Sequence, residues 1–372
     1  MSSQATALFD DGRSEAYDRS VPETVSMASS TDIRARAGRA TIRDIASLAG
    51  VSIATVSRVL NERPDVAAET REAVLEVVRA QGFSTNRSAR ALSAGRTGLV
   101  GVTLPIVHAA YFSYILSGAT EALYEQDMRA ILCPTLHQHD REVNLLDRLM
   151  HGTTDGAILM LPQESSEELK ALQEKGYPFV VADPRDYLDE GIPSVSAAHA
   201  SGAKQATQHL LGLGHRRVAA ITGEPGMATE ERRLGYHAAL AAAGIASDPD
   251  LVVEADWLIT GGAAAASRLL DLADPPTAIF AFNDNLAIGA IRAAQARGLT
   301  VPDELSVVGF DDTEEAAIVT PALTTVRQPL AEMGRMAVSL LGRLLDQQRV
   351  EALRVELATR LIVRNSTAPP RA

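Results

Sequence analysis

Hydrophobic residues beyond position 98 occur in short runs that are separated by amphipathic stretches of helical period. Short apolar runs bounded by turn residues are typical of strands that are buried on both faces. We expect strands at residues 99–104, 130–134, 156–161, 179–182, 218–222, 278–282 and 306–309. The clearest helical patterns between them lie at residues 112–126, 202–213, 231–243 and 285–297.

This alternation predicts an α/β fold in which helices cover both faces of parallel sheets. The pattern continues for about 270 residues, which is more than one sheet of ordinary size accommodates. We therefore expect two α/β lobes, with a ligand bound at the carboxyl ends of the strands.

The first hundred residues follow other patterns. Residues 1–39 are rich in Ser, Thr, Ala and charged residues without sustained periodicity, which predicts a disordered tail. Residues 40–83 have the pattern of three short helices, the third from about 68 to 81, and form an all-α domain. Residues 84–97 are basic and Ala-rich, and the two helical turns that they could form are too few to be stable in isolation. We expect a hinge there that folds only when something orders it.

The first two helices have clear start and stop signals. Thr41 is a suitable N-cap, and Asp44 stands three residues later, as in a capping box. Gly50 suits the left-handed position that ends a helix, and Ser52 is then the N-cap of the next one. The sequence therefore predicts two short helices joined by a tight turn.

The second of these helices exposes an unusual surface. Its period turns Val56, Val59 and Leu60 inward, and the opposite face then carries Ile53, Ala54, Ser57 and Arg58. Small apolar groups can contact thymine methyls in a major groove, and an arginine can bind guanine N7 and O6. This pattern favours a DNA-binding helix-turn-helix, and the alternative is an ordinary three-helix domain with a solvated face.

The formal net charge of −12 argues against a nucleic-acid partner until its distribution is considered. Residues 40–97 carry eight arginines against six acidic residues, and residues 84–98 carry three arginines and no acid. A local basic stripe can attract phosphates even on an acidic protein.

Several protein classes are disfavoured by what the sequence lacks. No run approaches 18 apolar residues, and residues 1–40 lack the basic start and apolar stretch of a signal peptide, so we expect a cytoplasmic protein. The single cysteine, Cys133, lies in an apolar run and excludes a disulfide framework. Glycine fingerprints for dinucleotides and phosphates are missing, and the His-Gln-His-Asp run at 137–140 has no matching second ligand cluster. We expect no catalytic residues, no cofactor and no metal.

The sequence resembles the lac repressor (LacI/GalR) family of bacterial transcriptional regulators over residues 41–367. The matching motifs in the N-terminal part are Ala-Gly-Val-Ser at 49–52, Thr-Val-Ser-Arg-Val-Leu-Asn at 55–61, Thr-Arg at 70–71 and residues 86–92. Farther on they are Gly-His-Arg at 214–216, Glu-Arg at 231–232, Asn-Asp at 283–284, Gly-Phe-Asp-Asp at 309–312, Pro-Ala-Leu-Thr-Thr at 321–325 and Leu-Ile-Val-Arg at 361–364.

The resemblance implies a set of DNA-binding positions. Ile53, Ala54 and Arg58 correspond to base-reading residues, and Leu92 corresponds to a hinge-helix leucine that enters the minor groove and bends the duplex. Thr85 departs from the family, which usually has proline before the asparagine. The complete predicted set is Thr41, Ser52, Ile53, Ala54, Thr55, Ser57, Arg58, Asn61, Asn86, Arg87, Ala89, Arg90 and Leu92.

The resemblance also implies that the α/β part is a periplasmic-binding-protein-like domain, residues 98–367, whose lobes close over a small effector. Chain crossings between lobes are expected near Asp183, Thr325 and Val350. Lobe 1 would then comprise residues 98–183 and 326–349, and lobe 2 residues 184–325 and 350–367.

The main candidates for effector binding are Asp183, Arg232, Trp257 and Asp284, with Phe112 as a further lining residue from lobe 1. Carboxylates and an arginine can bind hydroxyl groups through charge-assisted hydrogen bonds, and an indole can cover the apolar face of a sugar. Structural roles are the alternative for each. Asp183 could shape a turn, Arg232 could pair with a neighbouring glutamate, Trp257 and Phe112 could be core residues, and Asp284 could cap a helix.

These features predict a repressor that binds a pseudo-palindromic operator as a homodimer and is released by a sugar or sugar-derived effector. Within the same family, the alternative is a regulator that responds to a purine or acts with a co-regulator protein. A solute-binding protein for sugar uptake is the alternative from another class. Such a protein must be exported, and the sequence has neither a signal peptide nor a lipobox cysteine, while the helix-turn-helix has no purpose in it.

Overall fold

The computed structural model describes residues 40–60, 63–83, 96–107, 109–348 and 352–371. The chain divides into two compact units, residues 1–85 and 86–372.

The first unit contains α1 (Ile42–Leu48), α2 (Ile53–Leu60) and α3 (Ala68–Ala80), as the sequence predicts. Thr41 and Asp44 form the expected capping box, and the Ser52 hydroxyl accepts a hydrogen bond from the Thr55 backbone amide at 3.1 Å. Gly50 has a φ of +66°, the left-handed conformation required between the helices. The three helices enclose a small core made of Ile45, Ala46, Val56, Val59 and Val74.

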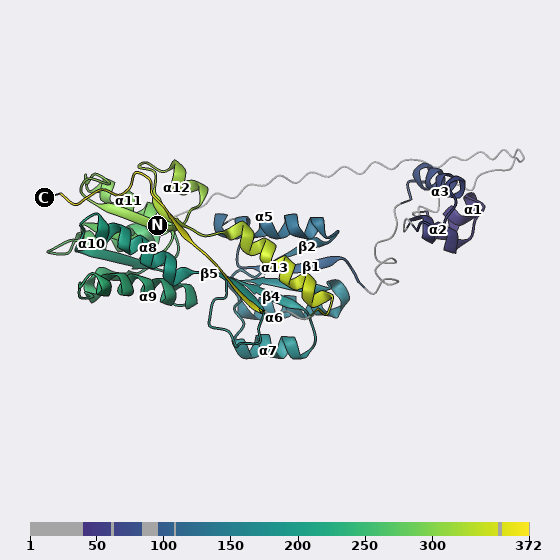
Figure 1. The fold of residues 1–372 in the computed structure, drawn as a ribbon, viewed down its shortest axis with the longest axis horizontal. Helices are drawn as coiled ribbons and strands as arrows, with labels where there is room; N and C mark the ends of the chain where they lie inside the picture. Colours follow the sequence, from purple (N-terminus) through teal and green to yellow (C-terminus); the bar gives the residue numbers. More distant parts are fainter. Residues whose placement is uncertain (1–39, 61–62, 84–95, 108, 349–351, 372) are drawn as a thin grey trace, which may run out of the picture. The chain divides into compact units, whose positions relative to one another are not determined.

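The second unit begins with a lobe built on a six-stranded parallel sheet (Figure 1). Its strand order is β11-β5-β4-β3-β1-β2. The strands are β1 (Leu99–Leu104), β2 (Arg129–Pro134), β3 (Gly156–Met160), β4 (Phe179–Ala182), β5 (Ser194–Ala197) and β11 (Arg354–Leu357).

Helices cover both faces of this first sheet. One face packs against α5 (Ala110–Glu125) and α13 (Leu330–Leu345), and the other against α6 (His139–Arg148) and α7 (Ser166–Glu174) (Figure 1). A short π-helical turn (Leu149–Thr153) follows α6. α5 and α13 approach closely through two glycines, because a Cβ on Gly118 would lie 1.8 Å from the Ala331 carbonyl oxygen and one on Gly334 would lie 2.0 Å from that of Ile115.

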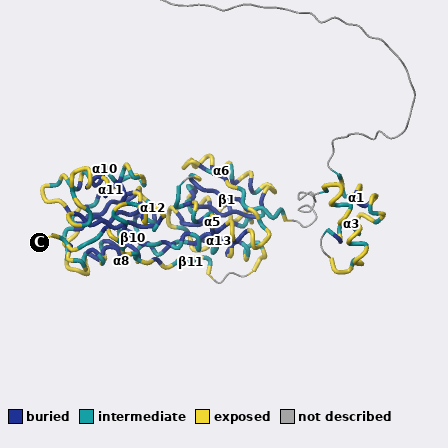
Figure 2. The backbone as a smooth tube through the Cα atoms, turned by 90° about the horizontal axis from the view of Figure 1, so that it is seen from above, coloured by how far each residue is buried: buried dark blue, intermediate teal, exposed yellow. Residues whose placement is uncertain are grey.

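The second lobe has its own six-stranded sheet, with the order β12-β10-β9-β8-β6-β7. Its strands are β6 (Val218–Thr222), β7 (Val252–Glu254), β8 (Ala278–Ala281), β9 (Ser306–Asp311), β10 (Thr324–Arg327) and the antiparallel β12 (Arg360–Ile362). Its helices are α8 (His199–Gly212), α9 (Met227–Ala242), α10 (Ile259–Leu270), α11 (Asp284–Ala296), α12 (Glu314–Ile318) and a 3₁₀ turn (Pro249–Leu251). In both lobes the buried residues are concentrated in the central strands and the helix faces against them (Figure 2).

Two of the predicted crossings between lobes are misplaced. β5 pairs with β4, and β11 pairs with β5, so both strands belong to the first lobe instead of the second. The segment after Asp183 returns to the first lobe because it is held there by hydrogen bonds from Asp189 to Ser166 and from Gln173 to Gly191. The chain therefore crosses between β5 and α8, between β10 and α13, and between β11 and β12.

Candidate functional site

The surface of α2 has the composition that the sequence predicts. Val56 and Val59 are buried in the core of the first unit, whereas Ile53 is 45% exposed and the Arg58 side chain is 62% exposed. Ala54 is also exposed. The Arg58 guanidinium lies 3.6 Å from Asp65, an exposed contact that is weak in water and easily exchanged for another partner. This face therefore presents two apolar side chains, Ile53 and Ala54, and one available guanidinium.

The other predicted DNA-binding residues fall into two groups. Thr41, Ser52 and Thr55 form the hydrogen bonds that begin α1 and α2, so they hold these helix ends in place. Ser57 is partly buried on α2. Six predicted positions lie outside the described residues: Asn61, Asn86, Arg87, Ala89, Arg90 and Leu92.

A second candidate site lies at the carboxyl ends of the strands, where the two lobes meet. Asp183 directly follows β4 and has a φ of +54°, a left-handed conformation that aspartate adopts more readily than most residues. Its carboxylate accepts a hydrogen bond from the Tyr111 hydroxyl at 2.6 Å and one from His199 Nε2 at 3.2 Å. Because His199 begins α8, the Asp183–His199 bond joins lobe 1 to lobe 2.

His199 in turn connects Asp183 to Arg232. Its Nδ1 accepts a hydrogen bond from Arg232 Nη2 at 3.2 Å, which leaves Nε2 as the protonated nitrogen that donates to Asp183. Burial and the nearby Arg232 charge lower the pKa of His199 and favour this neutral form. Burial alone would raise the pKa of Asp183, but the contacts with His199, Tyr111 and Arg232 outweigh it and hold that pKa below its ordinary value. A neutral imidazole thus bridges a buried carboxylate and a buried guanidinium.

Arg232 lies on α9, and its guanidinium packs against two aromatic rings. Its guanidinium lies 4.0 Å from the centre of the Phe310 ring and 5.7 Å from that of Trp257, and it donates a hydrogen bond to the Phe282 carbonyl. The indole of Trp257 lies against the backbone of Gly223, where a Cβ would come within 2.0 Å of the ring. The alternative in which Arg232 pairs with Glu230 is wrong, because Glu230 pairs with Arg233 instead.

Asp311 and Gln328 also belong to this cluster and, like His199, were not among the predicted effector-binding residues. Asp311 ends β9 with a φ of +125° and accepts a hydrogen bond from Gln328 Nε2 at 2.7 Å. Burial raises the pKa of Asp311 to about 7, although the Arg232 charge and the Gln328 hydrogen bond act in the opposite direction. The Gly-Phe-Asp-Asp motif at 309–312 could have identified Asp311 from the sequence, because it follows an apolar run and so places a carboxylate at a strand end, as at Asp183.

The side chains of Asp284 and Phe112 contact other residues of the protein in ways that stabilise the fold. Both carboxylate oxygens of Asp284 are engaged, because Oδ1 accepts from the Thr325 hydroxyl at 2.5 Å and Oδ2 from the Thr313 backbone amide at 2.8 Å. Burial and the neighbouring Asp311 raise the pKa of Asp284. The residue does not cap α11, since Asn283 is the N-cap. Phe112 is buried in the lobe 1 core, where its ring meets that of Tyr111 edge-on.

Two buried polar atoms of the cluster have no hydrogen-bond partner among the described residues. They are the Nε–H donor of Arg232 and the Oε1 acceptor of Gln328. An unpaired buried polar atom is costly, so such atoms often mark the place where a ligand or water completes the hydrogen bonds. A hydroxyl group both donates and accepts, and can serve either atom.

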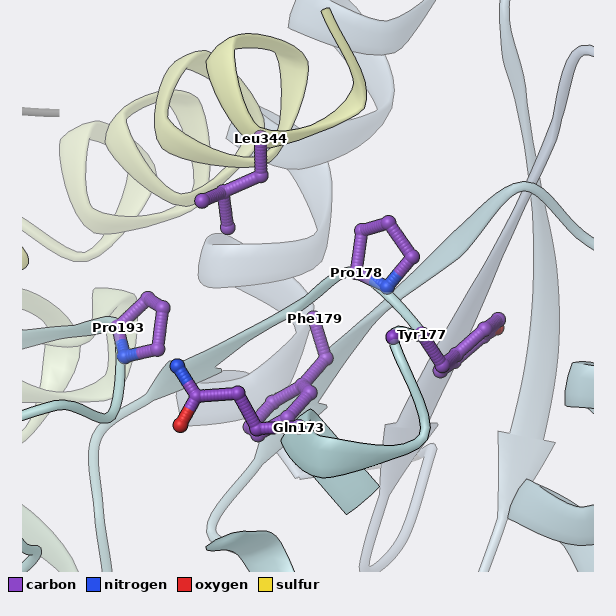
Figure 3. A pocket seen from close by; sticks show the side chains of 7 residues that line it. Gln173, Tyr177, Pro178, Phe179, Pro193 and Leu344 are labelled. Carbon is purple, nitrogen blue, oxygen red and sulfur yellow. The ribbon is translucent and has the colours of Figure 1, made fainter. Parts of the chain in front are cut away.

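The described part of lobe 1 also contains an open hollow at the other end of its sheet (Figure 3). It lies at the amino ends of β4 and β5, away from Asp183, and has no charged group in its lining. The lining residues are Gln173, Gly176, Tyr177, Pro178, Phe179, Pro193 and Leu344. Because its lining offers few groups that could orient a polar ligand, the cluster around Asp183 and Arg232 is the better candidate effector site.

The described residues give no support for a membrane-spanning helix or for a metal site. None of their helices is both long and apolar enough to cross a membrane. They also hold no group of three or more His, Cys, Asp or Glu side chains arranged for a metal ion.

Comparison with known protein families gives two matches. Residues 41–86 match the family of bacterial regulatory proteins called the lacI family, and residues 207–367 match a periplasmic binding protein-like domain. The catabolite control protein A of Priestia megaterium is 34% identical over 329 residues, which cover 88% of this chain and 99% of that protein.

Solved structures agree with these matches. A complex of the transcriptional regulator CelR with cellobiose is 34% identical, has a TM-score of 0.68, and is matched over 88% of this chain and 100% of that one. The lac repressor dimer bound to operator and the anti-inducer ONPF is 27% identical, has a TM-score of 0.81, and is matched over 89% of this chain and 100% of that one.

Proposed function

This chain belongs to the lacI family of bacterial transcriptional regulators, and from that premise we propose that a sugar or sugar-derived effector binds at the Asp183–Arg232 cluster and releases the protein from its operator. The observation that carries the proposal is the hydrogen-bonded series Asp183–His199–Arg232, which links the two lobes with buried polar groups. A ligand that rearranges these bonds changes how the lobes meet, and it can shift the protein between states only if it binds one of them more tightly.

The chemistry of the cluster suits a polyhydroxyl ligand. Asp183 supplies a carboxylate acceptor at a strand end of lobe 1 and Asp311 one at a strand end of lobe 2. Arg232 supplies donors, and Trp257 supplies an aromatic surface. Charge-assisted hydrogen bonds to hydroxyls with an aromatic ring beneath are a common way of holding a sugar. A solved structure of the related CelR is a complex with cellobiose, which adds support for a saccharide. Asp284 then acts indirectly, by holding Thr313 and Thr325 beside Asp311.

Trp257 provides a direct test, because it is the only tryptophan in the chain. We expect one member of a panel of mono- and disaccharides to change the intrinsic fluorescence in a saturable way and to raise the melting temperature. At a sugar concentration one hundred times Kd, the expected stabilisation is about 2.7 kcal/mol. The same sugar should reduce operator binding. If only purine bases produced these effects, the sugar assignment would be wrong, while the regulator assignment would stand.

The exposed face of α2 leads to the second part of the proposal, that Ile53, Ala54 and Arg58 contact base edges in the major groove. Arg58→Ala should relax the preference at one base pair, at a cost of about 1–3 kcal/mol, because a bidentate contact to guanine is lost. Selection of binding duplexes from a randomised pool measures the change. The control is Arg79→Ala, since Arg79 lies on α3 and its side chain donates to the Leu75 carbonyl. An unaltered base preference in Arg58→Ala would refute the base-reading role.

We further propose that two copies of the chain bind a pseudo-palindromic operator and that Leu92 of each enters the minor groove between the half-sites. The support is the related lac repressor, which was crystallised as a dimer on its operator. Such a protein works where the chromosome is, so we assign it to the cytoplasm, and we assign it no catalytic activity.

A further inference from the structure

Lobe 1 contains a second group of buried polar atoms that the proposed function does not use. Thr103 lies near the end of β1, Glu142 in the first turn of α6, and Glu164 in the loop between β3 and α7. Their side chains are almost completely buried, with residue exposures of 0%, 1% and 5%. They lie at the carboxyl ends of β1 and β3, which is the edge of the sheet that also carries Asp183.

Four oxygen atoms in this group have no hydrogen-bond partner among the described residues: Thr103 Oγ1, Glu142 Oε1 and both carboxylate oxygens of Glu164. Glu142 Oε2, by contrast, accepts a hydrogen bond from the Gln163 backbone amide at 3.0 Å. Two adjacent carboxylates can share a hydrogen bond only if one of them carries a proton. A single proton on Glu164 would supply that bond, and the Thr103 hydroxyl could then donate to a remaining oxygen.

The charges around the pair do not neutralise it. The groups that affect it electrostatically are His139 at the start of α6 and Glu168 on α7, and these two bind each other at 2.9 Å. Burial raises the pKa of Glu164 to about 8, and the charges of Glu142 and Glu168 act in the same direction. Burial likewise raises the pKa of Glu142, against the effects of Gln163, Thr103, His139 and Glu164.

The pair is connected to lobe 2 through three hydrogen bonds. Gln163 donates its backbone amide to Glu142, and its side-chain oxygen accepts from Arg185 Nη1 at 2.6 Å. The Arg185 carbonyl accepts from the Met227 amide at 2.7 Å. Met227 begins α9, the helix that carries Arg232. The loop that holds Glu164 is therefore tied to the helix that presents the effector-binding arginine.

We propose that Glu142 and Glu164 form a proton-binding site that holds one proton between their carboxyl groups and anchors the Gln163–Arg185–Met227 connection between the lobes. Loss of the proton places two negative charges side by side in the interior, which pushes the 161–165 loop outward and loosens the connection. A pH effect on effector affinity follows from this and rests on the proposed function, whereas the proton site itself does not.

The test uses full-length protein without effector, so its failure would leave the proposed function intact. A raised pKa in the folded state means that the folded protein retains a proton that the unfolded chain releases above its ordinary glutamate pKa. Stability is then lost as pH rises toward about 8, by tenfold in the unfolding equilibrium constant per pH unit. Glu164→Gln imitates the protonated acid, so the slope of the unfolding free energy against pH should decrease by the equivalent of one proton. The exposed control Glu167→Gln should leave that slope unchanged.

Two further measurements complete the experiment. Amide exchange of peptides covering residues 161–165 and 226–230, corrected for intrinsic rate, should rise from pH 6.5 to 8.5 in the natural protein and stay level in Glu164→Gln. Carbon NMR of ¹³C-glutamate in the natural protein should show one carboxyl titrating near pH 8, which tests the site even if the variant folds poorly. Equal pH slopes in both variants, or carboxyls that all titrate below pH 6, would overturn the proposal. Stabilisation by Mg²⁺ or Ca²⁺ that Glu164→Gln abolishes would also overturn it, in favour of a cation site.

Discussion

Replacement of Arg232 by alanine is expected to abolish the response to effector and to destabilise the protein by about 3–5 kcal/mol, the usual cost of removing one partner from a buried ion pair. Arg232 is 3% exposed and is the cation that compensates Asp183 and Asp311. Without it, two buried carboxyl groups remain beside a neutral histidine. The loss of stability should therefore be larger at pH 8 than at pH 5, because Asp311, whose pKa burial raises to about 7, is protonated and uncharged at the lower pH.

Arg233 supplies a matched control for this variant. It is the next residue on α9, its side chain is 40% exposed, and it pairs with Glu230 at 3.0 Å. Arg233→Ala should change stability by less than about 1 kcal/mol and leave effector binding intact, as expected for an exposed pair. Thermal unfolding and operator binding with and without sugar measure both effects. Normal induction in Arg232→Ala would remove this residue from the effector site.

The second large effect is expected from Gly118→Ala. A Cβ at this position would lie 1.8 Å from the Ala331 carbonyl oxygen, which belongs to the backbone and cannot move aside alone. α5 and α13 must separate along their length, and we expect a loss of about 3 kcal/mol, at the upper end of the usual cost of overpacking.

The same chemical change at Gly212 should have the opposite sign. Gly212 is the last residue of α8, and a Cβ there would meet no atom within 4 Å. Alanine has the higher helix propensity, so Gly212→Ala should be neutral or stabilise the protein by up to about 1 kcal/mol. Urea unfolding followed by circular dichroism compares the two variants. A Gly118→Ala protein as stable as the natural one would show that the helices do not pack as closely as described.

Much of the fold could be predicted because most strands of the central sheets are apolar runs. The predicted bounds of β1, β4 and β6 agree with the structure, and the other predicted strands differ only at their ends. Five strands were missed, namely β5, β7, β10, β11 and β12. Among them, β5 has the sequence Ser-Val-Ser-Ala and β11 has Arg-Val-Glu-Leu, and neither is an apolar run. Such segments are stabilised by pairing with a neighbouring strand and not by their own composition, and pairing partners are distant in sequence. The lobe boundaries were wrong for the same reason.

Some residues of the candidate effector cluster could be predicted from the sequence, and others could not. Asp183, Arg232 and Trp257 could be predicted as candidates because each stands at a strand end, a helix or a loop where the expected topology places a ligand, and the structure brings them together. His199 could not be predicted in the same way, because its position depends on β5. The chain crosses to lobe 2 only after β5, and His199 is the first helical residue beyond that crossing. Asp284 and Asp311 lie in similar motifs, and only the positions of Thr313 and Thr325 decide which carboxylate is engaged by the protein itself.

The last two strands of the chain have a consequence for how the protein is made. β11 completes the edge of the first sheet beside β5, and β12 completes the edge of the second beside β10. The first lobe therefore lacks its last strand until residue 357 has been synthesised, and the second lobe until residue 362. The helices of residues 42–80 have a core of their own and can form early on the ribosome. A nascent chain therefore carries a folded helix-turn-helix domain while β5 and β10 are still unpaired edges of their sheets.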